Sequence, residues 1–129
     1  TSLGIAPHTD YECFTIVAQD PTGGLQVQNA NGQRIESAPI PGTFVINIDD
    51  LIARWTNDQF VSTPHRVTQH NTQDRYSFAH FYGANYDVMV ECLETCCDAQ
   101  NPPKYKPVMA GKGRLSVIGR LILALEATT

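Results

Sequence analysis

The stretch Gly4-Ile5-Ala6-Pro7-His8-Thr9-Asp10-Tyr11 contains the pattern that decides the fold of this 129-residue chain. In an extended segment, side chains two positions apart point to the same side, so His8 and Asp10 face one way. An imidazole and a carboxylate at the end of one strand can share a metal ion. A second imidazole must reach the ion through the fold. His65, in Ser62-Thr63-Pro64-His65-Arg66-Val67, is the candidate.

Two histidines and one carboxylate on one face of an octahedron form a facial triad, which leaves three coordination positions open. This ligand set is typical of non-haem Fe(II) oxygenases. We therefore predict that His8, Asp10 and His65 are metal ligands and form the catalytic centre. Zinc can use the same ligand types. The alternative without a metal is a hydrogen-bonded polar site inside a β-sandwich.

The segment Arg75-Tyr76-Ser77 follows ten residues after His65. In a strand, the Arg75 guanidinium and the Ser77 hydroxyl would lie on one face. A guanidinium fork suits the bidentate binding of a carboxylate. A metal triad followed by a carboxylate clamp implies a cosubstrate that chelates the metal at one end and carries a carboxylate at the other, and 2-oxoglutarate has this structure. A surface salt bridge between Arg75 and Asp74 is the alternative.

These motifs together resemble the Fe(II)- and 2-oxoglutarate-dependent dioxygenase family, in its isopenicillin N synthase-like branch. The resemblance covers roughly residues 1 to 105. It rests on the segments quoted above and on two more that stand between them in family order, Gly23-Gly24-Leu25-Gln26-Val27 and Pro41-Gly42-Thr43-Phe44-Val45-Ile46-Asn47-Ile48.

The resemblance implies an oxidoreductase that uses Fe(II), 2-oxoglutarate as cosubstrate and O2, with ascorbate as an additional candidate. Arg75 and Ser77 would bind the far carboxylate of 2-oxoglutarate, which is decarboxylated to succinate. The substrate would be a small organic molecule of secondary metabolism, hydroxylated or desaturated. One alternative is an isopenicillin N synthase-like or ascorbate-dependent Fe(II) oxidase that does not use 2-oxoglutarate. The other is a catalytically inactive, truncated jelly-roll module.

Short β-rich segments separated by turn residues predict a mainly β fold. The expected strands are residues 14–19, 25–28, 33–36, 43–48, 60–61, 66–70 and 75–82. Asn31-Gly32 suggests a type I′ hairpin turn. A short helix is expected at residues 49–56, capped by Asp49 and Asp50, with Trp55 in the core. A double-stranded β-helix, the jelly roll of the cupin type, houses metal sites between such sheets.

We expect a jelly-roll domain at residues 1–109, followed by an amphipathic helix or tail at residues 110–129. The apolar residues of that helix recur at helical spacing, namely Leu115, Ile118, Leu121, Ile122 and Leu125. Family members of this branch are more than twice as long and have a helical N-terminal half. The jelly roll is therefore expected to be incomplete, with open β edges.

The composition argues against several classes of partner. A net charge of −4 and a pI of about 5.4 give no reason to expect nucleic acid or an anionic membrane surface as a partner. No apolar run approaches the length of a membrane span, and residues 1–4 do not resemble an export signal. We therefore expect a cytoplasmic protein whose four cysteines are reduced thiols. The substrate and the oligomeric state are left open by the sequence.

Overall fold

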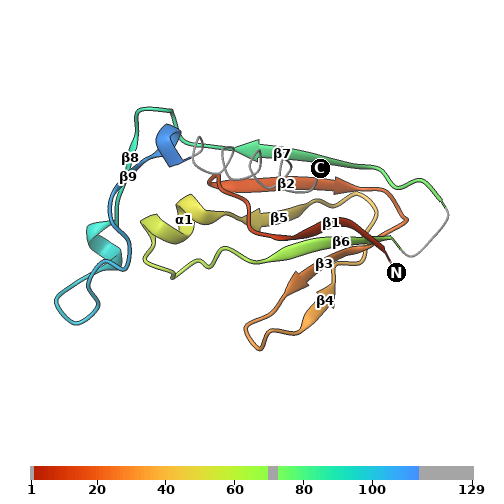
Figure 1. The fold of residues 1–129 in the computed structure, drawn as a ribbon, viewed down its shortest axis with the longest axis horizontal. Helices are drawn as coiled ribbons and strands as arrows, with labels where there is room; N and C mark the ends of the chain where they lie inside the picture. The colour runs from red at the N-terminus through yellow and green to blue at the C-terminus, as the bar shows by residue number, and fades with distance from the viewer. Residues whose placement is uncertain (1, 70–72, 114–129) are drawn as a thin grey trace, which may run out of the picture.

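A computed structural model describes residues 2–69 and 73–113, which form the antiparallel sheets of a jelly roll (Figure 1). The first sheet has the order β1-β6-β3-β4, made of β1 (Ser2–His8), β6 (His65–Gln69), β3 (Leu25–Gln28) and β4 (Arg34–Glu36). The second has the order β5-β2-β7, made of β5 (Val45–Ile48), β2 (Phe14–Gln19) and β7 (Ser77–Tyr82). The predicted mainly β fold is confirmed.

The chain crosses between the two sheets several times. It runs from β1 in the first sheet to β2 in the second, and β5 of the second sheet is followed by β6 of the first. As a result β1 and β6 are antiparallel neighbours, and His8 is paired with His65. Residues directly opposite each other in an antiparallel pair share one face of the sheet. The fold therefore places two histidines from distant parts of the sequence side by side.

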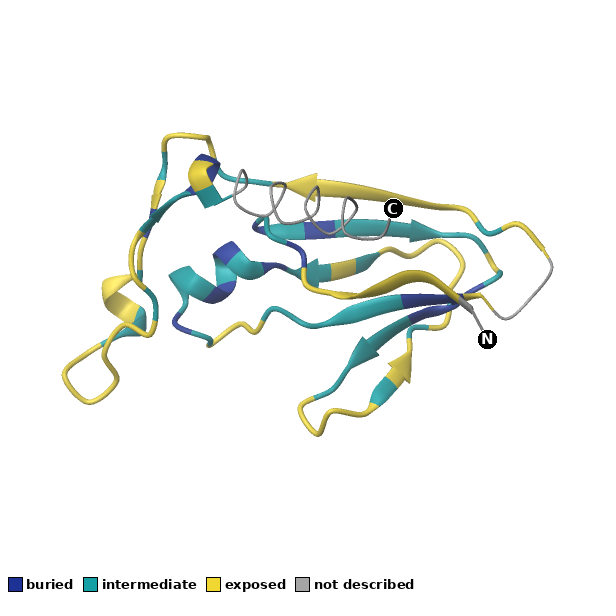
Figure 2. Ribbon diagram, in the orientation of Figure 1, coloured by how far each residue is buried: buried dark blue, intermediate teal, exposed yellow. Residues whose placement is uncertain are grey.

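The apolar core lies around the short helix α1 (Asp50–Trp55), where buried residues cluster in Figure 2. Leu51 is fully buried and packs with Cys13 and Val90. Val90 belongs to a two-stranded sheet of β8 (Met89–Val90) and β9 (Val108–Met109), and the 3-10 helix η1 (Glu94–Cys96) follows β8. Trp55 packs against this core as expected. All four cysteines are free thiols, and no helix in the described part of the chain is long and apolar enough to span a membrane.

The turn between β3 and β4 differs from the predicted type I′ turn. Gly32 has a positive φ of 76°, but Asn31 does not. The reason is the Asn29 side chain, whose Oδ1 accepts hydrogen bonds from the backbone N–H groups of Asn31 (3.0 Å) and Gln33 (2.9 Å). This Asx-type capping organises the loop without a second left-handed residue.

Several predicted strands begin or end elsewhere. β5 begins at Val45 and β7 at Ser77, so Arg75 precedes its strand. Before β7, the Tyr76 N–H donates to the Asp20 carboxylate (2.6 Å) and not to a ladder partner. Residues 60–61 form no strand, because the Phe60 N–H donates to the side chain of Thr56 beyond the end of α1. The sequence does not predict β8 and β9, since two-residue strands carry no periodic pattern.

Two predictions fall on parts of the chain that the structure does not describe. The expected end of one strand at His70 lies outside the described residues, as do residues 114–129 of the expected C-terminal helix. The division into residues 1–109 and 110–129 therefore stays a prediction.

Strand β7 is the exposed edge of its sheet. Among the described strands it pairs with β2 alone, and all six of its residues are exposed (Figure 2). Phe78 is 79% exposed, and Phe81 and Tyr82 are each more than half exposed. A free strand edge flanked by apolar side chains is a template for association with another strand.

We expect the isolated 129-residue chain to self-associate through β7. Phe78→Lys should shift it toward the monomer, because a charge on an edge strand opposes edge pairing. Ile40→Lys is the matched control, since Ile40 is also exposed (67%) but lies outside the strands. Light scattering over a concentration series measures the mass. A wild-type chain that is monomeric and melts cooperatively would contradict this expectation.

Candidate metal centre

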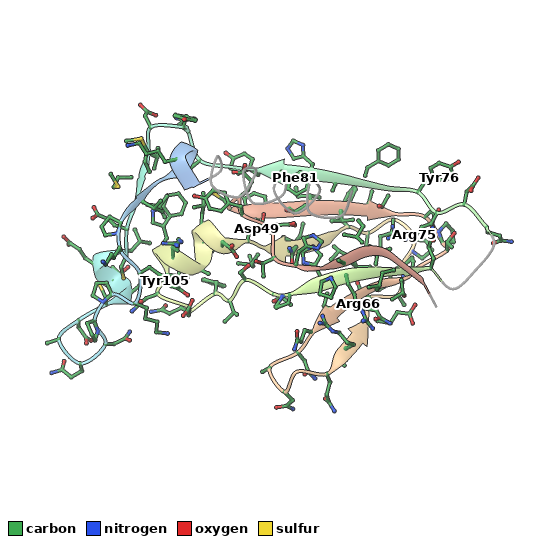
Figure 3. The ribbon with its side chains drawn as sticks, viewed as in Figure 1. Asp49, Arg66, Arg75, Tyr76, Phe81 and Tyr105 are labelled. Carbon is green, nitrogen blue, oxygen red and sulfur yellow. The ribbon has the colours of Figure 1, made fainter. Side chains whose placement is uncertain are left out.

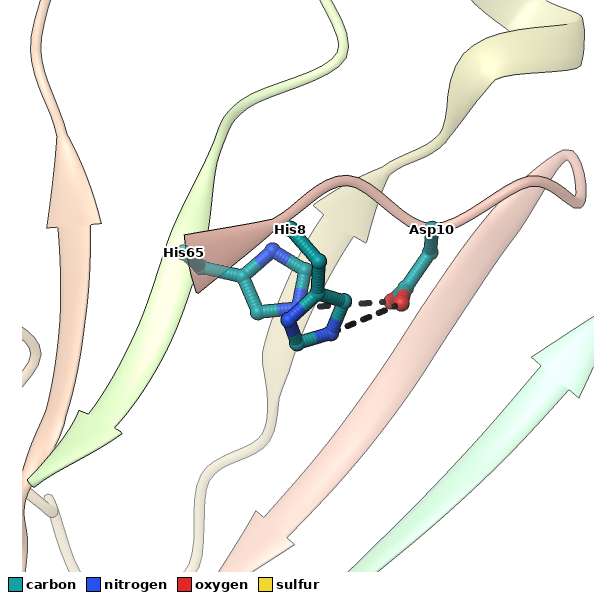
Figure 4. Close-up of side chains that lie close together, drawn as sticks. All are labelled: His8, Asp10 and His65. Atoms are coloured by element: carbon teal, nitrogen blue, oxygen red, sulfur yellow. Dashed lines mark ion pairs between the residues drawn. The ribbon is translucent and has the colours of Figure 1, made fainter. Parts of the chain in front are cut away.

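The structure brings His8, Asp10 and His65 together, as Figure 4 shows. His8 is the last residue of β1, and His65 is the first residue of β6. Nε2 of His8 lies 3.4 Å from Oδ1 of Asp10, and Nε2 of His65 lies 3.6 Å from Oδ2. The three potential ligand atoms all lie within 4.8 Å of one another. No other group of three potential ligands of this kind occurs in residues 2–69 and 73–113.

Backbone carbonyl groups determine which nitrogen of each imidazole is free. Nδ1 of His8 lies 2.8 Å from the carbonyl oxygen of Ala6, and Nδ1 of His65 lies 3.1 Å from that of Thr63. A carbonyl oxygen only accepts hydrogen bonds, so each Nδ1 carries the hydrogen. In the neutral form of each histidine, Nε2 therefore keeps its lone pair, and this lone pair faces the site. Such second hydrogen bonds orient metal-binding histidines in general.

Asp10 supplies the negative charge of the site and is only 9% exposed. Burial tends to raise the pKa of Asp10, but hydrogen bonds involving His8, Thr15 and Asn47, together with the electrostatic interaction with His65, outweigh burial and lower it. The contact with Asp10 raises the pKa of His8. An ionised carboxylate is the form that binds a metal, whereas a proton on a histidine nitrogen competes with the metal.

The residues present fit an Fe(II) ion. Two imidazole nitrogens and one carboxylate are the donor set of the facial triad. His8 is 38% exposed and His65 is 13% exposed, so the centre is open on the His8 side. An opening of this kind leaves room for ligands that do not come from the protein. Metal binding by these three residues nevertheless stays a prediction.

Asp49 is a residue of this site that the sequence analysis assigned elsewhere. It occupies the N-cap position of α1, but its side chain makes no capping hydrogen bond there. Its carboxyl group is instead fully buried and contacts the Thr15 hydroxyl (2.8 Å) and the Asn47 amide (3.1 Å). The capping role predicted for Asp49 is therefore wrong, because the side chain turns inward to polar partners on β2 and β5.

The pKa of Asp49 is raised to about 7, chiefly by burial and also by the charges of Asp10 and other nearby carboxylates, against the opposing hydrogen bond from Thr15. The Thr15 hydroxyl has one hydrogen, yet it lies within hydrogen-bond distance of both Asp10 (2.9 Å) and Asp49 (2.8 Å). A proton on Asp49 would satisfy both contacts. The raised pKa of Asp49 agrees with this count of hydrogens.

Arg75 and Ser77 also lie together. Nη1 of Arg75 donates to Oγ of Ser77 (3.1 Å), Nη2 to Oε1 of Gln19 (3.4 Å), and Nε to the carbonyl oxygen of Gly23. The ion pairs among the described residues include none between Arg75 and Asp74. A guanidinium has five N–H groups, so within residues 2–69 and 73–113 one on each terminal nitrogen remains for a bidentate acceptor.

Glycine permits the close approach that positions the Gly23 carbonyl. Gly24 has a φ of 92°, and a Cβ atom at this position would collide with the carbonyl oxygen of Thr68. Gly24 can therefore lie against β6, and the preceding Gly23 directs its carbonyl group at Arg75. Gly23 and Gln19 are partners of Arg75 that the sequence analysis missed, and no local motif identifies them.

The metal centre and Arg75 lie at two ends of one inner face. Thr15 and Gln19 are four residues apart on β2 and share a face. Thr15 contacts Asp10, and Gln19 contacts Arg75. Four residues of strand span about 13 Å. In Figure 3, Asp49 lies near α1 and Arg75 lies toward the opposite end of the strands.

Comparison with known proteins agrees with this geometry. The sequence model of the 2OG-Fe(II) oxygenase superfamily matches residues 1–84. The 2-oxoglutarate-Fe(II) type oxidoreductase hxnY of Emericella nidulans is 42% identical over 106 residues, which are 81% of this chain and 30% of that protein. The chain thus spans about a third of the length of the curated relatives that it matches.

Two solved structures are similar in both fold and sequence. A full-length Neurospora crassa protein in complex with alpha-KG and thymine has a TM-score of 0.81 and 38% identity, over 91% of this chain and 38% of that one. JOX2 in complex with 2OG, Fe and JA has a TM-score of 0.82 and 34% identity, over 88% of this chain and 34% of that one.

The histidine predicted to complete the metal site can be tested directly. We expect His65→Ala to weaken Fe(II) binding by more than the roughly 10–100-fold that loss of an outer-shell partner costs, because it removes a ligand atom. Anaerobic Fe(II) titration, which should saturate near one equivalent in the wild type, measures the affinity. His80→Ala is the control, since His80 is exposed on β7. Equal iron binding by His65→Ala and wild type would refute the assignment.

Proposed function

The chain belongs to the 2OG-Fe(II) oxygenase superfamily, and from this premise we propose that it is the metal-binding part of an Fe(II)- and 2-oxoglutarate-dependent oxygenase. One observation carries the proposal. A cluster of two histidines and an aspartate lies at one end of an inner sheet face. At the other end lies a guanidinium with two N–H groups that have no partner in the described part of the chain. A molecule with a chelating group at one end and a carboxylate at the other can engage both.

His8, Asp10 and His65 would hold Fe(II) through two imidazole nitrogens and one carboxylate. When bound, the ion supplies the oxidation of a substrate C–H bond by O2, coupled to decarboxylation of 2-oxoglutarate to succinate and CO2. The protein contributes the positions of the three ligand side chains and the protonation state of the two histidines. The carbonyl groups of Ala6 and Thr63 hold the hydrogen on Nδ1 of each histidine, which keeps both Nε2 atoms available.

Arg75 would bind the far carboxylate of 2-oxoglutarate. The bonds to Gly23 and Gln19 fix the plane of the guanidinium, so its two remaining N–H groups are already oriented for a carboxylate. The Ser77 hydroxyl is held at the same place by Nη1 of Arg75 and adds one more donor. A preoriented fork loses less conformational freedom when the carboxylate binds.

The proposed substrate is a small organic molecule, which would be hydroxylated or desaturated. The similar solved structures hold thymine or JA. Curated relatives at 39–43% identity include azadirone synthase and homoarginine-6-hydroxylases. These names cover several chemical classes and support a small-molecule substrate without selecting one. A role in secondary metabolism and a cytoplasmic location are parts of the same proposal.

The clamp can be tested by anaerobic titration of the Fe(II) protein with 2-oxoglutarate, following the metal-to-ligand charge-transfer band. Arg75→Ala should weaken 2-oxoglutarate binding by roughly 100-fold, because it removes two charge-assisted hydrogen bonds of about 1.5 kcal/mol each. Iron binding should be retained, since Arg75 is not a ligand. Arg75→Lys should recover only part of the affinity, because an ammonium group cannot form the bidentate fork.

Arg66→Ala is the matched control for Arg75→Ala. Arg66 is also a half-buried arginine, but its Nε donates to the side chain of Gln26 (2.8 Å). Arg66→Ala should leave the 2-oxoglutarate titration unchanged. An unchanged titration in Arg75→Ala would exclude the clamp. If wild-type protein binds iron but shows no band, the result would favour an oxidase that does not use 2-oxoglutarate or an inactive module.

A further inference from the structure

We propose that Thr15, Asn47 and Asp49 position the Asp10 carboxylate so that it binds the metal through Oδ1 alone. The inference rests on the proposed metal site and adds three positioning residues to it. None of the three belongs to the group of potential metal ligands, which is His8, Asp10 and His65. They act on the Asp10 carboxylate.

The two oxygens of Asp10 have different surroundings. Oδ2 lies within hydrogen-bond distance of the Thr15 hydroxyl (2.9 Å) and accepts a hydrogen bond from the Asn47 amide (3.2 Å). Nε2 of His65 also lies 3.6 Å from Oδ2, and Nε2 of His8 lies 3.4 Å from Oδ1. Within residues 2–69 and 73–113, Oδ1 has no hydrogen bond from Thr15 or Asn47. A metal that binds Oδ1 meets a free lone pair, whereas binding at Oδ2 would compete with two hydrogen bonds. The carboxylate is therefore set for monodentate binding.

Asp49 fixes the two residues that hold Oδ2. Its Oδ1 accepts a hydrogen bond from the Asn47 amide (3.1 Å), and its Oδ2 contacts the Thr15 hydroxyl (2.8 Å). The Asn47 amide has two hydrogens, one for Asp10 and one for Asp49. Asp10 and Asp49 are thus bridged twice, once through each intervening side chain. The bridges determine the orientation of both Thr15 and Asn47.

The cluster is buried and tied to the backbone. Thr15 is 1% exposed and Asp49 is 0% exposed. Thr15 and Asn47 are paired across β2 and β5, and the backbone N–H of Asp50 donates to the carbonyl oxygen of Asp10 (3.0 Å). Because buried hydrogen bonds in a rigid sheet restrict rotation, the Asp10 side chain is preorganised before a metal arrives.

The test compares isosteric variants of Thr15. Thr15→Val removes the hydroxyl and keeps the shape, and it should weaken anaerobic Fe(II) binding by about 10–100-fold, as loss of an outer-shell partner does. Thr15→Ser restores the hydroxyl and should bind Fe(II) nearly as well as wild type. Asp49→Asn should also retain affinity, since an amide can keep the contacts to both Thr15 and Asn47. Competition with a chelator of known affinity measures each value.

A spectroscopic readout separates positioning from simple destabilisation. With Co(II) alone as the probe, the ligand-field bands should change in Thr15→Val, because Oδ2 then keeps only the Asn47 hydrogen bond and can reach the metal more easily. They should return in Thr15→Ser. Thr68→Val is the control, since Thr68 is an equally buried threonine (4% exposed) whose hydroxyl contacts the Gly24 carbonyl (3.3 Å) and not Asp10. It should alter the melting temperature without altering the Co(II) bands.

The outcomes of these experiments test the positioning role and the metal site separately. Wild-type affinity and bands in Thr15→Val, or an equal loss in Thr68→Val, would overturn the positioning role. If Thr15→Val does not fold, Asn47→Leu removes the other donor to Oδ2 at a less buried position and should weaken Fe(II) binding in the same way. Normal binding by Asn47→Leu would then overturn the proposal. No Fe(II) binding by wild type would instead refute the metal site itself.

Discussion

The pairing of β1 with β6 is the constraint on which the rest of the site depends. Its register places His8 opposite His65, and the crossing of the chain between the two sheets then places Asp10 beside both. Side chains alternate along a strand, so a shift of one residue would move His65 to the other face of its sheet. The register shifts between Ile5 and His8, so the site depends on the pairing at this end of the two strands.

Polar burial is the second constraint. Asp10, Thr15 and Asp49 are all buried, although a buried carboxylate without partners is strongly destabilising. Each of these groups is satisfied by another member of the same cluster, with Asn47 completing it. The same hydrogen bonds that make the burial tolerable also hold the Asp10 carboxylate beside His8 and His65, at the proposed metal site. Folding and function therefore rest on one set of contacts here.

The sequence by itself determined which residues are candidates for the site and which short segments form strands. The HxD pattern, the distant His65 and the pair Arg75 and Ser77 are all visible in it, because each combines a distinctive chemistry with a strand-like spacing. Segments with clear β character, such as residues 14–19 and 25–28, are also predicted with their correct bounds. Local pattern is enough where the residue and its immediate neighbours determine the structure.

Only the tertiary structure decided which partners these residues have. Asp49 resembles a helix cap in sequence, but its side chain turns to Thr15 and Asn47 on two neighbouring strands. Likewise, the Gly23 carbonyl and the Gln19 side chain that orient Arg75 are distant from it along the chain. Such contacts depend on the register and packing of separate strands, and a buried polar group takes whichever partners this packing provides.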